Sequence, residues 1–564
     1  MHDDQHIARL YLLDRAIHQG YFYPRWVDTL GFSFGYPLFN FYPPLIYYIG
    51  EVFHKVGFSL IWSVKLVIMA GFALSVSGMY LFLKKKLGPM FSGVGATLYG
   101  YLSYHAILVY VRGAFAEFFS VALLPFVFLS LENFAAKKTL RSGALFAVCF
   151  ALLILAHPLI AFPFLIFLGL YGLFFLVKDK QKIKLLAFLA GAILLGLSLA
   201  AFFWLPAMIE RNYTQVDLLS TTNLAAYGLH YVCPGQFIYS PWGYGGSIPG
   251  CQDGLSFQLG KVYLGLLFLS IVGAVFYWFK KRKFDSTLQY YGLYLFLMSF
   301  SLFMTTSFSA VIWDNLKFLA YLQFPWRFLT FAGFFLSAAA AFSLHFLAQW
   351  LKKGQGKRIA GVISIIIILV TIGTYQKYFK PQSYIVTTDQ QKTSFEEIAW
   401  NVSLTSLDFI PKGVPTKKLN QDRITVDIDK SNLQPNLYNV YRGNTKRVDV
   451  LKNTMREKEF NIDAFVPLEF WLYTFDFPGW KAYLNDKEIP IYPNETFQLI
   501  SVKIPQGYHN LRFVFEDTLV RKIANAISLV AIFAVLYILF GSKFKQIERR
   551  FASGFNKPLY KFNG

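Results

Sequence analysis

Long apolar runs, each about the length of a membrane span, constrain this chain more than any other feature. A helix needs about 20 mostly apolar residues to cross the hydrocarbon core of a bilayer. The first such run covers residues 60–83 and ends in three lysines. Ten more follow at 91–107, 115–131, 142–155, 159–176, 185–204, 262–279, 288–305, 328–350, 360–375 and 523–540. We therefore predict an α-helical polytopic membrane protein with about eleven spans.

The net charge of +22 raises the question of nucleic-acid binding. The basic residues stand mostly in short clusters between apolar runs, which is the pattern of cytoplasmic loops in membrane proteins. Charged residues make up only 15% of the chain, against about 25% in soluble domains. We therefore expect a lipid bilayer as partner and no nucleic acid.

Basic and non-basic links alternate along the chain, and this alternation predicts its sidedness. It places three segments on the extracytoplasmic side of the cell membrane: the first residues, the loop at 205–260 and the stretch 376–520. The basic C-terminus lies in the cytoplasm. This layout places Met1 outside with no span before it. We therefore expect that one N-terminal span precedes the sequence and that the native protein has about twelve.

The stretch 376–520 has a different character from the rest of the chain. Its segments RITVDI, FWLYTFDF, FQLISVKI and LRFVFED are rich in β-branched and aromatic residues and are separated by Asn, Pro and Gly. This pattern predicts an extracytoplasmic all-β domain, a small sandwich. The chain then divides into a transmembrane domain (1–375), the β domain (376–520), and a final span with a basic tail (521–564).

Residues 2–26 mix acids, histidines and arginines, unlike the spans that follow. Asp4 is placed to cap a helix that Gly20 ends, and the aromatic segment 21–26 is suited to a membrane surface. We predict a helix lying along the interface, and a second one at 39–57. The alternative for Asp3 and Asp4 is a purely structural role as charges at a helix N-terminus.

The three cysteines are divided between two settings. Cys149 lies inside an apolar run and is expected to be inert, whereas Cys233 and Cys251 share one long loop. If that loop is extracytoplasmic, a disulfide between them is plausible.

Several short motifs together resemble one known family. They are HDDQH (2–6), RGAFAE (112–117), the His157-Pro158 turn, SPWGYG (240–245), QFPWR (323–327) and FPGW (477–480). The chain resembles the GT-C superfamily of integral-membrane glycosyltransferases, and most closely a group of bacterial GT-C-like membrane proteins related to protein O-mannosyltransferases and the aminoarabinose transferase. It departs from the family in the absent first span and in Gln5, where several relatives have a second acid.

The resemblance implies a glycosyltransferase that moves a sugar, with inversion, from a polyprenyl-phosphate-linked donor to a saccharide, lipid or protein acceptor. Such a transfer needs a carboxylate to take the proton of the acceptor, and cationic groups to stabilise the departing phosphate. Asp4 is the expected base, because its spacing to Gly20 and Pro24 matches the family better, with Asp3 as the other candidate.

The other expected contacts with substrate come from charged and aromatic residues near the external ends of spans. An arginine side chain can bind two phosphate oxygens at once, which favours Arg112, Arg211 and Arg327 as phosphate ligands. The alternatives are structural: a membrane anchor at Arg327, an ion pair on one helix end between Arg112 and Glu117, and a helix cap at His157. The full predicted set is Arg112, Glu117, His157, Glu210, Arg211, Trp326 and Arg327.

No cofactor is expected, because a monophosphate leaving group needs no metal when arginines are present. A divalent metal held by Asp3, Asp4 and a histidine, His2 or His6, is the alternative. Two other functions compete with the enzyme: a transporter or flippase for lipid-linked saccharides, and a non-catalytic assembly protein for envelope polymers. The charged residues lie at the ends of spans and not at the mid-membrane positions that transporters use, which favours the enzyme.

Overall fold

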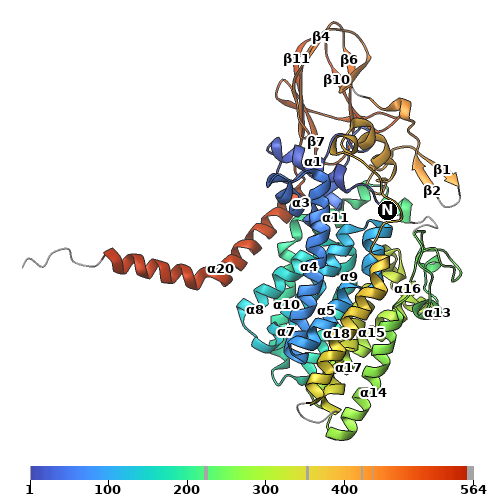
Figure 1. Ribbon diagram of the computed structural model, residues 1–564. Helices are drawn as coiled ribbons and strands as arrows, with labels where there is room; N and C mark the ends of the chain where they lie inside the picture. Colours follow the sequence, from blue (N-terminus) through green and yellow to red (C-terminus); the bar gives the residue numbers. More distant parts are fainter. Residues whose placement is uncertain (1, 221–225, 351–354, 421–422, 435, 556–564) are drawn as a thin grey trace, which may run out of the picture.

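A computed structural model describes residues 2–220, 226–350, 355–420, 423–434 and 436–555. A bundle of long helices carries a β-sheet domain at one end, and the N-terminal residues lie between the two parts (Figure 1). The predicted fold class, a polytopic helical membrane protein with a β domain, is confirmed.

Eight helices of the described ranges are long and apolar enough to cross a membrane, or nine if one bent pair is a single span. Several end in the lysines and glycines expected of their termini; α4, for example, ends with Lys84, Lys85 and Lys86 before Gly88, whose φ is 79°. The eight are α4 (Leu60–Leu87), α7 (Phe115–Lys137), α9 (Pro158–Lys178), α10 (Lys182–Leu199), α14 (Lys261–Lys281), α17 (Leu329–Trp350), α18 (Gln355–Tyr375) and α20 (Leu519–Phe555).

The other three predicted spans are helical but shorter or bent. The run at 91–107 divides into α5 (Pro89–Gly100), α6 (Ser103–Ala106) and the π-helical η1 (Ile107–Arg112). The helix α8 (Leu140–Ala156) has 17 residues, and α15 (Ser286–Thr305) meets the following helical segment at 88°. Eleven full-length spans were therefore too many, because hydropathy does not show where a helix breaks.

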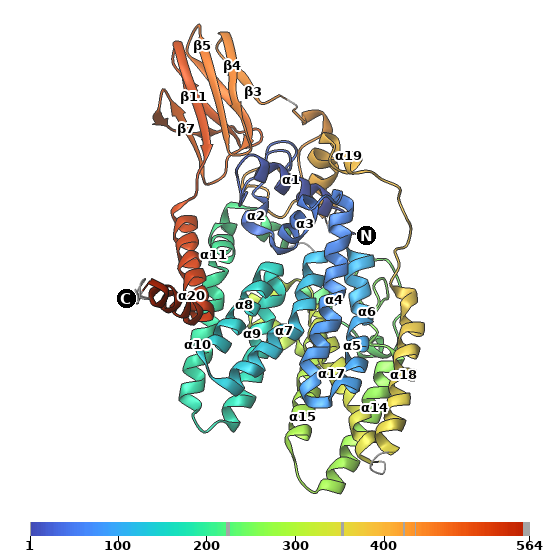
Figure 2. The same cartoon turned by 60° about the vertical axis from the view of Figure 1, so that its left-hand side comes forward.

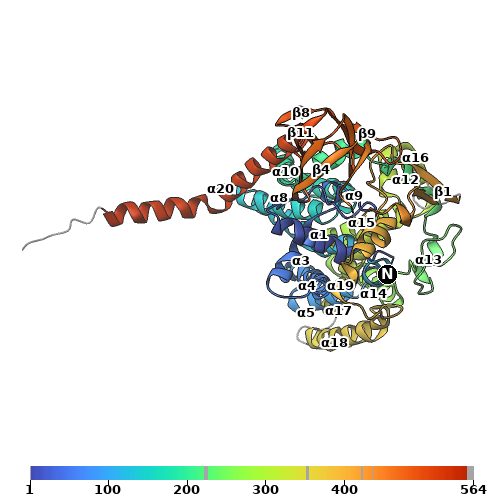
Figure 3. The ribbon, with the colours of Figure 1, turned by 90° about the horizontal axis from the view of Figure 1, so that it is seen from above.

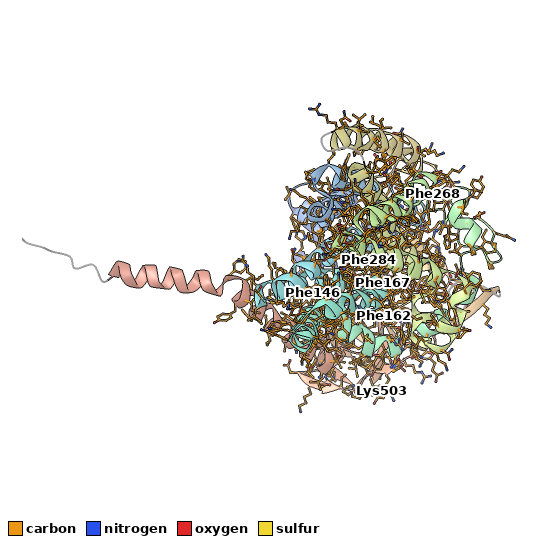
Figure 4. The ribbon with its side chains drawn as sticks, turned by 90° about the horizontal axis from the view of Figure 1, so that it is seen from below. Phe146, Phe162, Phe167, Phe268, Phe284 and Lys503 are labelled. Carbon is orange, nitrogen blue, oxygen red and sulfur yellow. A yellow bond between two sulfur atoms is a disulfide. The ribbon has the colours of Figure 1, made fainter. Side chains whose placement is uncertain are left out.

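The helix α17 lies deep inside the bundle. All its side chains from Leu329 to Leu344 are buried, and the small residues at 338–341 let neighbouring helices approach closely. Aromatic rings fill the remaining space: seen from below, the fully buried Phe146 and Phe167 lie among the helices, while Phe268 lies at the rim, 65% exposed (Figure 4). This rim is the surface that faces lipid.

The β domain is a sandwich of two sheets. One sheet has the strand order β3-β6-β10-β9 and the other β4-β5-β11-β7-β8, with antiparallel pairing throughout. Phe460 and Phe513 of the second sheet meet Phe470 of the first, with ring centroids 5.1 and 6.3 Å apart. The strands are β3 (Tyr438–Arg442), β4 (Thr445–Asn453), β5 (Glu457–Ala464), β6 (Leu468–Phe475), β7 (Trp480–Leu484), β8 (Lys487–Ile489), β9 (Tyr492–Pro493), β10 (Leu499–Ile504) and β11 (Gly507–Phe515).

The stretch from 376 to 415, predicted as part of the β domain, instead contains short helices. They are η8 (Gln376–Tyr378), α19 (Asp389–Lys392) and the π-helical η9 (Glu397–Val402). A separate hairpin of β1 (Thr416–Asn420) and β2 (Arg423–Val426) follows. The helices α19 and η9 lie beside the N-terminal segment (Figure 2).

The N-terminal segment forms α1 (His6–His18), α2 (Leu38–Phe41) and α3 (Leu45–Lys55). Gly20, with a φ of 78°, follows the end of α1 as expected. The expectation that Asp4 caps α1 is wrong: Gln5 holds the N-cap position without a side-chain cap, and the Asp4 carboxylate bonds to Lys392.

The aromatic segment 21–26 was expected at a membrane surface, but its end is buried under the β domain. Trp26 is fully buried and packs against Phe477, Trp480 and Phe515, with ring centroids 5.6–5.9 Å apart. A side chain at Gly35 would approach the Trp26 ring to 2.4 Å, so this contact requires glycine there. The FPGW motif at 477–480 thus docks the β domain onto the N-terminal segment.

The helix α20 begins directly after the sandwich and lies at the periphery of the bundle, from which it extends away (Figure 3). Ser528 attaches it to the neighbouring helix pair: its hydroxyl donates to the carbonyl of Ser198 at 2.9 Å and accepts from the amide of Phe202 at 2.9 Å. The first turns of α20 are therefore fixed against the bundle.

Lys458 on β5 is buried where the sandwich meets the N-terminal segment. Its ammonium donates to the side-chain oxygen of Asn453 at 2.6 Å, and the Asp28 carboxylate, 3.9 Å away, is already engaged by Arg15. Burial, reinforced by Arg15, therefore lowers the pKa of Lys458 to about 7.

This lowered pKa predicts a pH-dependent stability. Between pH 7 and 10.5 the unfolded chain holds a proton that the folded protein lacks, so Lys458 makes stability rise with pH across that window. We expect Lys458→Met to remove a rise of about 2 kcal/mol between pH 7 and 9. Thermal unfolding of the full chain in detergent measures it, with the exposed Lys487→Met as control. An unchanged pH slope in Lys458→Met would contradict the buried-lysine argument.

Candidate functional site

The site is built where residues 2–6 run alongside η1. The amide of His2 donates to the carbonyl of Val111 at 3.0 Å, and the amide of Asp3 donates to that of Arg112 at 2.9 Å. Further along, the His6 ring contacts the carbonyl of Gly113 at 2.6 Å. These contacts bring the HDDQH and RGAFAE motifs together.

Two guanidinium groups converge on one buried carboxylate, Glu117, in the first turn of α7. Gly113 turns the chain with a φ of 70°, and Arg112 then bonds to Glu117 at 2.7 Å. The Nε of Arg327, in η7 (Pro325–Phe328), lies 3.6 Å from the same carboxylate, to which the Tyr104 hydroxyl also donates at 2.9 Å. We name Arg112, Glu117 and Arg327 the arginine cluster.

The arginine cluster carries an excess of positive charge and unused donors. Its two guanidinium groups face a single carboxylate, and the Arg112 guanidinium also lies over the Trp326 ring at 4.7 Å. The Nε1 of Trp326, the Nε of Arg327 and the Nδ1 of His157 are buried without a hydrogen-bond partner in the described chain. Buried polar atoms are normally paired, so this arrangement suits an anionic ligand.

The histidines near the arginine cluster are held neutral. Burial lowers the pKa of His157 to about 3, and burial together with Arg9 lowers that of His6 to about 4. Burial acts to lower the pKa of Arg112, but the neighbouring Glu117 carboxylate has the larger combined effect. The pKa of Arg112 therefore lies above its ordinary value. His157 occupies the N-cap position of α9, but its side chain makes no cap hydrogen bond. The predicted capping role is therefore not observed.

The two candidate bases have different surroundings. The Asp4 side chain is 52% exposed and pairs at 2.7 Å with Lys392, which also bonds to Glu397 at 2.9 Å. Asp3 is half-buried and lies within electrostatic range of Arg112 and His6. Asp3 is therefore held beside Arg112 by its backbone, while the Asp4 carboxylate is paired with Lys392 next to η9.

A third acid, Asp408, was not found by sequence reasoning. Its neighbours are tied to the start of α1: Gln5 donates to Thr405 at 2.9 Å, and the Ser406 hydroxyl donates to Gln5 at 3.0 Å. Asp408 is exposed, and its carboxylate lies within electrostatic range of Arg9 and Asp3. A lone acid between apolar residues gave no motif that could have identified it.

Glu210 and Arg211 lie apart from the arginine cluster. The Glu210 carboxylate accepts from Arg521 at 2.9 Å, Asn40 at 2.8 Å and Thr518 at 2.7 Å, which joins α11 (Ala201–Glu210) to α20. Arg211 donates to the Tyr321 hydroxyl at 2.7 Å and lies over its ring. Both residues thus have partners within the protein, and their contact with a substrate stays a prediction.

A disulfide-closed loop borders the N-terminus. Cys233 and Cys251 are bonded, as considered from the sequence, and Cys149 is free. The loop carries Tyr244, whose carbonyl oxygen lies 3.0 Å from the Nε2 of His2. The SPWGYG motif therefore reaches the same region as HDDQH. Within the described ranges, no group of three His, Cys, Asp or Glu side chains is placed to hold a metal ion.

The chain combines several helices of membrane length with a β sandwich, and its polar candidate site lies between them. These features define an integral membrane protein. A family model described as "6-pyruvoyl-tetrahydropterin synthase related domain; membrane protein" matches residues 39–379, more than half of the chain. The chain belongs to this membrane-protein family. No curated protein matches its sequence.

Proposed function

We propose that this membrane protein is a glycosyltransferase of the GT-C type, which transfers a sugar with inversion from a polyprenyl-phosphate-linked donor to a saccharide, lipid or protein acceptor. The observation that supports this function is the arginine cluster beside Asp3: two guanidinium groups share one carboxylate, and buried donors lack partners. The family description names a related domain and states no reaction for this chain.

In the proposed reaction the acceptor oxygen forms a bond to the anomeric carbon of the sugar. The bond between that carbon and the phosphate oxygen breaks, and its electron pair leaves with the lipid phosphate. Arg112 and Arg327 stabilise the charge that develops on this phosphate. The acceptor proton passes to a carboxylate, for which Asp3 is better placed than Asp4 because Asp4 is paired with Lys392.

We place the site and the β domain on the extracytoplasmic side of the cell membrane and the C-terminus in the cytoplasm. Support comes from the basic ends of α4 and α14, Lys84–Lys86 and Lys280–Lys281, which follow the positive-inside rule. A cysteine at Asn485 should react with an impermeant thiol reagent in intact cells, and one at Lys281 should not. The link after Trp350, also basic, lies partly outside the described residues.

The arginine cluster gives the direct test of the enzyme. We expect Arg327→Gln to lower sugar transfer from native lipid extract on the order of a hundredfold, because the glutamine keeps a donor but not the charge. Arg442→Gln, on an exposed strand, is the matched control. Size-exclusion profiles show whether each variant folds, and Arg327→Lys, which keeps the charge, should recover part of the rate. A folded Arg327→Gln variant with full activity would overturn the proposal.

A further inference from the structure

A cavity of about 600 Å³ lies between the N-terminal aromatic segment, α3 and the first turns of α20. It is separate from the arginine cluster, which contributes no residue to its lining. It lies at the junction of the β domain and α20, a helix long and apolar enough to cross a membrane.

The cavity is polar at the boundary and apolar further in. Arg456 and Asp517 adjoin strands of the β domain in the sequence, whereas Leu529 and Ile532 lie further along α20. On α20 the lining residues recur at 525, 528, 529 and 532, which is one face of a helix. From 525 to 532 this face extends roughly 10 Å at 1.5 Å per residue. A lipid, with its polar head group and hydrocarbon chain, has the same distribution of polarity.

The polar end favours a negative head group. Arg25 is buried and its guanidinium is committed to Asn40 at 3.1 Å, the Phe202 carbonyl at 2.8 Å and Asn525 at 3.0 Å, with Asp517 at 3.4 Å. Arg456 uses its Nε for the Phe515 carbonyl at 3.1 Å, while its terminal nitrogens have no hydrogen-bond partner within the described part of the chain. Two guanidinium groups against one carboxylate leave a net positive charge.

We propose that this cavity binds a lipid phosphate, with the phosphate at Arg456 and the hydrocarbon chain along Leu529 and Ile532. Arginine is suited to phosphate because its fork of donors fits two oxygens at once. The lipid is a membrane phospholipid or a polyprenyl phosphate, which share this chemistry. The proposal does not depend on the glycosyltransferase activity, because a site of this kind serves a transporter or an assembly protein equally.

A photoactivatable phosphatidic acid, with a diazirine on its acyl chain, tests the site in the full protein reconstituted in nanodiscs. We expect peptide mapping to place the crosslinks on α20 around residues 529 and 532. Arg456→Gln should reduce this labelling roughly fivefold to tenfold, since it removes a charge-assisted contact with the phosphate. Arg447→Gln, an exposed arginine of the same domain, should label as the unmodified protein does.

A second pair of variants tests the apolar end. Ile532→Trp adds bulk inside the cavity and should reduce labelling, whereas Phe533→Trp, one residue along and outside the lining, should not. Because both substitutions lie on the same turn of α20, a general effect on the helix would change both. Equal labelling of the two variants would overturn the assignment of the chain to this cavity.

Competition identifies the ligand. Unlabelled phosphatidic acid should displace the probe, and polyprenyl phosphate should displace it better if it is the natural occupant. Phosphatidylcholine that competes equally well would show only annular lipid, and displacement by millimolar inorganic phosphate would show a phosphate site without lipid specificity. Either result overturns the proposal. Since only binding is measured, an inactive arginine cluster would leave the outcome unchanged.

Discussion

Replacing Asp3 by Asn is expected to reduce sugar transfer by roughly a hundredfold to ten-thousandfold, the usual cost of losing a positioned general base. The amide keeps the shape of the side chain but cannot accept the proton. The fold should persist, because the contact of residue 3 with Arg112 is made by its backbone amide, which the substitution retains. The measurement is transfer from native lipid extract at matched expression.

Asp4→Asn is the matched control for this prediction. Its carboxylate is half exposed and paired with Lys392, so we expect a milder effect, arising from the loss of that pair. The opposite result, with loss only in Asp4→Asn, would return the role of base to Asp4, the residue that sequence spacing favours. Full activity in both variants would contradict a catalytic role for this segment.

Hydropathy predicted the class of fold well because the bilayer imposes one length and one polarity on every span. It could not predict the number of spans. The run at 91–107 appears continuous in the sequence, yet the structure breaks it after Gly100 and continues it as the short α6 and the π-helical η1. That break determines where Arg112 lies, so the least predictable part of the bundle is the part that forms the site.

The sandwich was predictable because its strands alternate, but its contact with the rest of the protein was not. Trp26 carries the same signal as an interfacial tryptophan, and only the position of FPGW in space shows that the β domain covers it. Asp408 is a second residue whose contacts could not be predicted from the local sequence. It reaches the site through hydrogen bonds between segments about 400 residues apart, such as Gln5 with Thr405, and no local pattern encodes such a pairing.

The convergence of short motifs was predictable only in outline. Arg112, Glu117, His157, Trp326 and Arg327 were expected near external ends of spans, and the contacts of the arginine cluster bring most of them together. Glu210 and Arg211 carried the same sequence signal, an acid and a base after an apolar run. Charge and position alone did not distinguish the residues that gather around Glu117 from those that pair elsewhere in the structure.

The Glu210–Arg521 pair gives the largest expected effect on stability. Both side chains are almost fully buried, and Arg521 also donates to the Pro478 carbonyl at 2.9 Å, so it joins α11, α20 and the FPGW turn. Removal of one partner leaves the other charge buried and unpaired, which costs about 3–5 kcal/mol. We therefore expect Glu210→Ala to lower the melting temperature of the full chain in detergent more than any exposed-pair variant does.

The exposed pair Lys481–Glu488, 3.0 Å apart, provides the control for this prediction. Because solvent screens it, Glu488→Ala should cost less than about 1 kcal/mol. The double variant Glu210→Leu with Arg521→Met should recover much of the stability lost in Glu210→Ala, since it leaves no buried charge unpaired. If Glu210→Ala and Glu488→Ala have the same melting temperature, the buried pair does not hold the β domain and α20 to the bundle. In that case other contacts, such as the packing of Trp26 against Trp480, hold these parts together.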